Sequence, residues 1–231
     1  MSKSLKERFK DLEYARVGSF GNDVSTPRLR RLALWHFHLF DHAFLRGLWQ
    51  NLEEIAPGVW RSNQPSPKRI KKYKKMGIKT ILSLRGNPNQ PISFMLLEQQ
   101  ACDDLGITLV TENLSARSLS PKESYLAVLD RLDQLKPPFL LHCKSGADRA
   151  GLVSALYLLH VKGAPLSEAR KQLSWRFMHL KSTKTGILDH LLESYAADME
   201  RLGDMPIRDW FENHYDQKAI SAQFTPLWKH S

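Results

Sequence analysis

A cysteine and an arginine with five residues between them stand where an apolar run meets a helix-forming run. They are Cys143 and Arg149, in the segment His-Cys-Lys-Ser-Gly-Ala-Asp-Arg-Ala-Gly at 142–151. The apolar run precedes it at 138–141, and the helical pattern follows at 152–161. On a strand-to-helix turn, successive backbone N–H groups at the helix N-terminus form a cradle for an anion. The segment therefore predicts an oxyanion-binding loop.

The chemistry expected of this loop is nucleophilic. The positive field of the cradle favours the thiolate form of Cys143, and the Arg149 guanidinium can bind two phosphate oxygens at once. A thiolate on the floor of such a cradle can attack phosphorus and form a phosphocysteine that water later hydrolyses. The spacing alone is common by chance, so the strand, the preceding His142, Gly146 in the turn and the following helix make it informative.

These residues resemble the signature loop His-Cys-x5-Arg of the cysteine-dependent protein tyrosine phosphatase superfamily. The loop is most similar to those of the atypical dual-specificity branch and of bacterial tyrosine or lipid phosphatases, which carry Asp just before Arg. The stretches 57–65 and 76–85 resemble the opening strands of that branch, so the resemblance spans roughly residues 55–180. It implies a phosphomonoester hydrolase of the tyrosine or dual-specificity type that uses a phosphocysteine intermediate and neither metal nor other cofactor.

The resemblance also assigns roles to the loop residues. Cys143 and Arg149 become catalytic, and His142 supports the loop and the thiolate by hydrogen bonds. The residues expected to bind substrate are Lys144, Ser145, Gly146 and Ala147 in the loop, with Arg117 and Lys184 outside it. Lys181 is a further candidate for the rim of the pocket.

The proton donor for the leaving group is not where most of the superfamily has it. The loop at 112–121, which usually supplies an Asp, contains none. By resemblance to the Asp-before-Arg phosphatases, Asp148 is the candidate acid. The alternative is that Asp148 caps the helix and is held ionised by its N–H groups. Glu112 is a weaker candidate for the acid.

A second departure from the family pattern follows the arginine. Ala150 stands where the family usually has Ser or Thr, whose hydroxyl eases departure of the cysteine sulfur; Ser145 is a candidate substitute. This leaves a catalytically weak phosphate-binding adaptor as an alternative. A rhodanese-type sulfurtransferase is less favoured, because it does not need His before Cys.

Composition bounds the partners and the compartment. The 231 residues carry a formal charge of +10, which favours a phosphorylated protein or an anionic phospholipid as substrate. Phosphoinositides or other phospholipids are therefore the alternative substrate class, and no nucleic acid is expected.

Two cysteines, Cys102 and Cys143, do not make a disulfide framework, so we expect a cytoplasmic protein. No apolar stretch approaches the ~20 residues of a membrane span, so membrane contact would be peripheral.

The N-terminal part of the chain is explained less well. Residues 1–26 are polar and predict a frayed start, and 28–49 predict a basic, aromatic helix. This helix either covers the catalytic domain or lies in a bilayer interface. His38 and His42 have the spacing of a metal pair, but aromatic packing is the favoured explanation and no metal is expected.

The elements that must position the loop alternate along the chain. Strands are predicted at 59–61, 79–84, 108–112 and 139–142, and helices at 66–76, 91–105, 121–135 and 150–161, followed by helices at 165–177, 185–201 and 208–218. Alternation predicts an α/β fold, a mostly parallel sheet of four to five strands flanked by helices, with the site at the carboxyl ends of the strands. We expect an N-terminal extension at 1–54 and a phosphatase domain with a helical C-terminal portion at 55–231.

Overall fold

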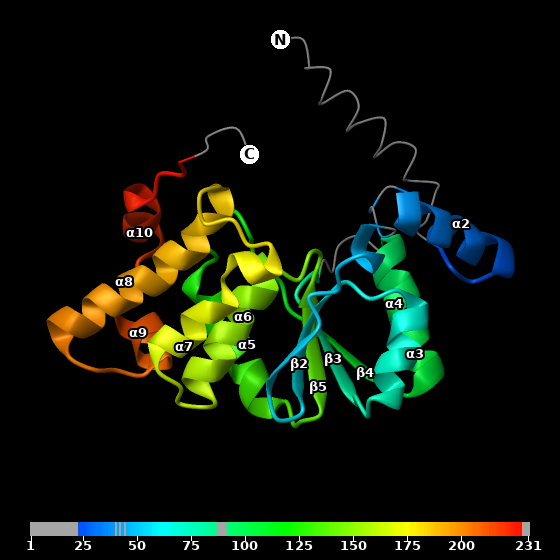
Figure 1. Cartoon of the computed structure of the whole chain (residues 1–231), viewed down its shortest axis with the longest axis horizontal. Coiled ribbons are helices and arrows are strands. Elements are labelled where there is room, and N and C mark those ends of the chain that lie inside the picture. The colour runs from blue at the N-terminus through cyan, green and yellow to red at the C-terminus, as the bar shows by residue number, and fades with distance from the viewer. Residues whose placement is uncertain (1–22, 40, 42, 44, 87–91, 228–231) are drawn as a thin grey trace, which may run out of the picture. The chain divides into compact units, whose positions relative to one another are not determined.

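A computed structural model describes residues 23–39, 41, 43, 45–86 and 92–227 (Figure 1). The predicted frayed start falls almost wholly outside this part of the chain, as does His42. The described residues form two compact units. One comprises the residues up to Trp49 with Pro65–Met76 and those of 87–107; the other comprises Gln50–Gln64, Gly77–Gly86 and the residues from Thr108 onward.

The second unit contains a five-stranded sheet. Its strands are β1 (Glu53–Ala56), β2 (Val59–Asn63), β3 (Thr80–Ser83), β4 (Thr108–Thr111) and β5 (Phe139–Cys143), in the order β1-β2-β5-β3-β4. Among the strands that the structure describes, β1 pairs with β2 antiparallel, whereas β2, β5, β3 and β4 pair in parallel. The predicted α/β class with a mostly parallel sheet is thus confirmed. The antiparallel edge strand β1 was not predicted.

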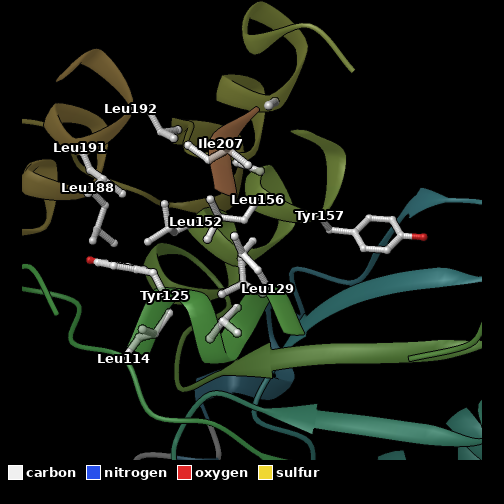
Figure 2. Packing of buried hydrophobic residues seen from close by; sticks show 14 of the residues in the cluster. Leu114, Tyr125, Leu129, Leu152, Leu156, Tyr157, Leu188, Leu191, Leu192 and Ile207 are labelled. Atoms are coloured by element: carbon white, nitrogen blue, oxygen red, sulfur yellow. The ribbon is translucent and has the colours of Figure 1, made fainter. Parts of the chain in front are cut away.

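The helices of this unit lie on one face of the sheet (Figure 1). They are α5 (Lys122–Gln134), α6 (Asp148–His160), α7 (Leu166–Ala169), α8 (Ile187–Leu202), α9 (Ile207–Asn213) and α10 (Gln217–Gln223). Figure 2 shows the core that they share, with Leu152 and Leu156 of α6 near Ile207 and the leucines of α8. Burial of these side chains drives the assembly of the layer.

Strand β5 is the middle strand of the sheet. All five of its residues are buried, and its first three, Phe139, Leu140 and Leu141, are apolar, as is typical of an inner strand of a parallel sheet. Cys143 pairs with Asn63 at the end of β2, and His142 pairs with Ser83 at the end of β3. The loop after Cys143 therefore leaves the sheet at the carboxyl ends of its neighbours.

The first unit is helical. It contains α2 (Pro27–Leu39), the 3-10 turn η1 (Leu45–Gly47), α3 (Pro67–Lys75) and α4 (Ser93–Leu105). The Ser66 side chain accepts the Arg69 N–H and Pro67 follows it, a favourable start for α3. Phe37 of α2 is buried with Phe94 and Leu97 of α4.

Three predicted helices are corrected. The helix expected over 28–49 ends at Leu39, and the one over 165–177 is broken into α7 and the 3-10 turns η2 (Arg170–Gln172) and η3 (Trp175–Phe177). The helix over 208–218 is two helices, since Asp216 caps a new start at α10 through the N–H groups of Lys218 and Ala219. On α2, Phe37 is buried while Trp35 is 63% exposed. The described aromatic residues are therefore neither all buried, as a helix covering the catalytic domain would have them, nor all exposed, as a bilayer-interface helix would.

Candidate active site

Cys143 ends β5, and α6 begins at Asp148 after four intervening residues. The Cys143 side chain is 1% exposed. Between them Gly146 has φ +75°, and a Cβ there would lie 2.7 Å from Asn63 N and 2.8 Å from Ser62 C. The positive φ and the close approach each favour glycine, so Gly146 lets the loop curl against the end of β2.

Arg61 of β2 lies buried beneath this loop. Its Nη2 donates to the carbonyls of Gly146 at 2.5 Å and Ala147 at 3.3 Å, while Nη1 donates to the backbone and side-chain oxygens of Gln172, both at 2.7 Å. The guanidinium also stacks 3.7 Å from the ring centre of Phe177. Burial lowers the pKa of Arg61 to about 10, opposed by the Cys143 sulfur, so the group is charged at neutral pH.

This buried cation does two things for the loop. It binds the carbonyls of Gly146 and Ala147, so these two oxygens are satisfied by a side chain outside the loop. Its charge also interacts favourably with the Cys143 sulfur. The loop is therefore held by a buried cation that also interacts with the cysteine sulfur.

Asn51 holds the loop from a second side. Its Nδ2 donates to the Ser145 carbonyl and to the Phe177 carbonyl, each at 2.9 Å. The Gln64 N–H donates to the Lys144 carbonyl at 3.2 Å. The loop carbonyls thus have partners outside the loop, as buried backbone oxygens require.

Arg149 in the first turn of α6 reaches across to neighbouring loops. Its Nη1 donates to the Leu84 carbonyl at 2.9 Å and to the Leu114 carbonyl at 3.5 Å. Nε has no hydrogen-bond partner among the described residues, and the side chain is half-buried. Nη1 is thus anchored to the backbone, while the buried Nε keeps an unused donor.

Asp148 takes part in an arrangement that was not predicted. Its Oδ1 lies 2.8 Å from His179 Nδ1, and His179 Nε2 lies 2.6 Å from Oδ2 of Asp189 on α8. Burial lowers the pKa of His179, but the hydrogen bonds to both carboxylates outweigh it and raise the pKa to about 9. His179 is therefore an imidazolium at neutral pH and donates from both nitrogens.

The remaining predicted loop residues differ in burial. Lys144 is exposed, Ser145 is half-buried, and Gly146 and Ala147 are buried. The Ser145 hydroxyl accepts the Ala147 N–H at 3.2 Å. His142 is fully buried, with Nδ1 3.3 Å from the Cys143 carbonyl, and Ala150 shares the hydrophobic core with Cys143.

The candidates outside the loop are not gathered around it by any contact. Glu112 is ion-paired at 3.0 Å with Arg131 of α5, which disfavours it as the acid. Lys181 pairs with Glu193 at 2.5 Å. Arg117 and Lys184 are exposed, and their place in a substrate site stays a prediction.

Sequence reasoning missed Asn51, Arg61, His179 and Asp189. Arg61 had a signal, because a charged residue between Val59 and Asn63 on the inward-facing side of a buried strand requires a partner. His179 and Asp189 had none, since each stands alone in the sequence and the chain brings them to Asp148 only through tertiary folding.

Comparison with known proteins defines the family. The model of the Swiss Army Knife proteins with a DSP-PTPase phosphatase domain (PTP-SAK) matches residues 51–188, more than half of the chain. The chain belongs to this family. It is accordingly a cysteine-dependent phosphatase of the tyrosine or dual-specificity type. No curated protein matches the sequence significantly.

Several solved structures are similar to this chain. TpbA of P. aeruginosa is 21% identical over 64% of this chain and 91% of its own, with a TM-score of 0.47. A putative phosphatase from Shewanella putrefaciens is 19% identical over 63% and 93%, with a TM-score of 0.49. The catalytic core of the S. cerevisiae PP-IP phosphatase SIW14 is 18% identical over 66% and 94%, with a TM-score of 0.49. In the part of the chain that is described here, no helix is long and apolar enough to cross a membrane.

Proposed function

We propose that this phosphatase hydrolyses phosphomonoesters of protein through a phosphocysteine on Cys143. The observation that carries the proposal is the loop itself: a buried cysteine at the end of β5, backbone carbonyls tied outward by Arg61 and Asn51, and Arg149 at the start of α6. Such an array stabilises a thiolate and the equatorial oxygens of a transferring phosphoryl group together.

The chemistry proceeds in two steps. The Cys143 sulfur attacks phosphorus and forms the S–P bond while the bond to the leaving oxygen breaks; Arg149 and the loop N–H groups hold the three equatorial oxygens. A water molecule then attacks phosphorus, the S–P bond breaks, and phosphate leaves. No metal is needed in either step.

Asp148 is the proposed donor of a proton to the leaving oxygen. It stands at the first turn of α6, one residue before Arg149, and its Oδ2 has no hydrogen bond among the described residues. Its Oδ1 lies 2.8 Å from His179 Nδ1. The proposal requires Asp148 to carry a proton when substrate is bound.

The experiment for this proposal is substitution of the nucleophile and its clamp. Cys143→Ser and Arg149→Lys are each expected to lower kcat/KM for an aryl phosphate by several orders of magnitude, since Lys keeps the charge but loses the fork. Cys143→Ser should still bind substrate. Turnover like that of the unmodified protein in Cys143→Ser would refute the mechanism, and failure to bind any phosphate would refute the site.

A phospholipid substrate is the second candidate, and one feature favours it. The segment tied to the loop by Asn51 and His179 exposes Trp175 (73%) and Met178 (48%). Exposed apolar side chains beside a phosphate site suit a substrate with an apolar part. Release of phosphate from phosphoinositide vesicles, compared with phosphotyrosine and phosphoserine peptides, separates the two candidates. The Trp175→Ala variant should lose activity selectively on the vesicles if the lipid is the substrate.

A further inference from the structure

Of the three residues in the Asp148–His179–Asp189 arrangement, His179 and Asp189 have no place in the chemical steps described above. His179 is 3% exposed and cannot touch the substrate directly. It nevertheless joins the first turn of α6, where the candidate acid stands, to α8 through two hydrogen bonds of 2.8 and 2.6 Å. A buried imidazolium held between two carboxylates is costly to desolvate unless both bonds are kept.

The two oxygens of Asp148 are unequal because of this contact. Oδ1 accepts the His179 Nδ1–H, while Oδ2 has no hydrogen bond among the described residues and the side chain is 20% exposed. One oxygen is thus fixed from the protein interior, and the other is the oxygen that can carry a proton. The rotation of the carboxyl group is set by His179.

We propose that His179, held by Asp189, is the positioning residue for Asp148: it fixes Oδ1 so that the Oδ2 proton is presented to the leaving group. The inference rests on the proposed function, in which Asp148 is the acid. When the bond from phosphorus to the leaving oxygen breaks, the proton moves from Oδ2 to that oxygen and a carboxylate remains beside the imidazolium. In the second step the same carboxylate takes a proton from the attacking water, so the proton balance closes over one cycle.

Electrostatics agrees with this role. The pKa of His179, raised to about 9, keeps the cation present throughout the neutral range. The charged groups that face it are Asp148 on α6 and Asp189 on α8, and Arg61 of β2 acts on Asp148 from the other side of the loop. The cation stabilises the carboxylate formed by proton transfer, which favours the transfer itself.

The test uses two substitutions of His179, one that keeps the hydrogen bond to Asp148 and one that keeps the hydrogen bond to Asp189. In His179→Asn the amide occupies the place of Nδ1 and can still donate to Asp148; in His179→Gln it occupies the place of Nε2 and can bond only Asp189. We measure kcat/KM, which reports on formation of the phosphocysteine, for an aryl phosphate with a good leaving group and for an alkyl phosphate with a poor one. Positioning predicts that His179→Gln loses about tenfold more on the alkyl phosphate than on the aryl phosphate, a fraction of what general acid catalysis supplies. His179→Asn keeps the donor to Asp148, so it should show a much smaller selective loss on the alkyl phosphate.

The control is a carboxylate–histidine contact elsewhere in the chain. Asp133 lies 3.0 Å from His160 at an exposed position, and Asp133→Asn should change neither rate. Equal losses on both substrates in a folded His179→Gln protein, or identical behaviour of the Asn and Gln variants, would overturn the inference. If His179→Gln does not fold, Asp189→Asn carries the same test, with unequal losses in support and equal losses against.

Failure of the inference and failure of the proposed acid are distinguishable. Asp148→Asn reports on the acid itself: equal losses on both substrates there would remove Asp148 as donor, however the His179 variants behave. Unequal losses in Asp148→Asn with equal losses in His179→Gln would leave the acid in place and remove only the positioning role.

Discussion

At the scale of single residues, the loop depends on groups that never touch phosphate. Arg61 satisfies two loop carbonyls and two Gln172 oxygens from a fully buried position. Arg61 therefore stabilises the loop, because removing either the cation or its four acceptors leaves uncompensated polar groups inside the protein.

Replacement of Arg61 should therefore cost stability as well as activity. We expect Arg61→Met to lower the free energy of unfolding by about 3–5 kcal/mol, the range for breaking a buried ionic network. Urea denaturation measures it, with Arg208→Met, which removes a guanidinium that pairs at the surface with Asp130, as the control expected to lose about 1 kcal/mol or less. Equal, small losses in both would show that Arg61 does not hold the loop.

Gly146 gives a second prediction at this scale. Gly146→Ala meets both a positive φ and backbone atoms within 3 Å, so we expect a loss of stability above the ~1–2 kcal/mol of left-handed strain, together with a large fall in kcat/KM. Gly163→Ala is the matched control, since Gly163 has φ +60° but nothing within 4 Å of a Cβ. If the two variants lose the same stability, close approach of the loop to β2 is not what requires Gly146.

At the scale of elements, His179 ties the loop to α8 and makes this tie depend on pH. Its pKa is raised from 6.5 to about 9 in the folded protein, so the stability that it supplies is fully present below pH 6.5 and is lost as pH rises through about 9. The shift corresponds to roughly 3 kcal/mol. We expect the free energy of unfolding to fall by this order between pH 6.5 and 9.5. His179→Gln should remove that dependence, and an unchanged slope would contradict the tie.

Cys102 of α4 bears on redox behaviour. Burial, with Glu98 and Asp103, raises the pKa of its thiol to about 12, so it stays protonated and unreactive at neutral pH. Both cysteines are free thiols. We expect peroxide to inactivate the protein reversibly through Cys143, at the same rate in Cys102→Ser. A slower or irreversible inactivation of that variant, or a Cys102–Cys143 disulfide by mass spectrometry, would show instead that Cys102 takes part.

The sequence predicted the features that depend on neighbouring residues better than those that depend on tertiary contacts. The parallel sheet and the position of Cys143 at a strand end followed from local pattern, because an apolar run, a turn with Gly146 and a helix are adjacent in the chain. The broken helix over 165–177 did not follow, since Gly151 of α6 admits the Gln172 carbonyl at a distance that no Cβ would allow. The sequence did not predict the partners of Asp148 either, because His179 and Asp189 come close to it only in the folded chain.

At the scale of the whole molecule, charge is the dominant feature. A net charge of +10 attracts anionic substrates over distances beyond direct contact. We expect kcat/KM for an acidic phosphopeptide to fall several-fold with rising salt while kcat stays constant, since salt screens the approach and not the bound complex. Steady-state kinetics at several ionic strengths, with a neutral phosphopeptide as the control, measures this. A salt effect of the same size on the neutral peptide would exclude steering.

The central claim is that hydrolysis passes through a phosphoryl group on Cys143, and rapid acid quenching followed by mass spectrometry tests it most directly. Ala150 offers no hydroxyl to assist departure of the sulfur, so breakdown should be the slower step and the intermediate should accumulate. The predicted result is a Cys143 peptide carrying one phosphoryl group, formed within the first turnover and lost as substrate is exhausted. The account would be contradicted if hydrolysis continued with no phosphorylated Cys143 at any time point and the Cys143→Ser variant were as active as the unmodified protein.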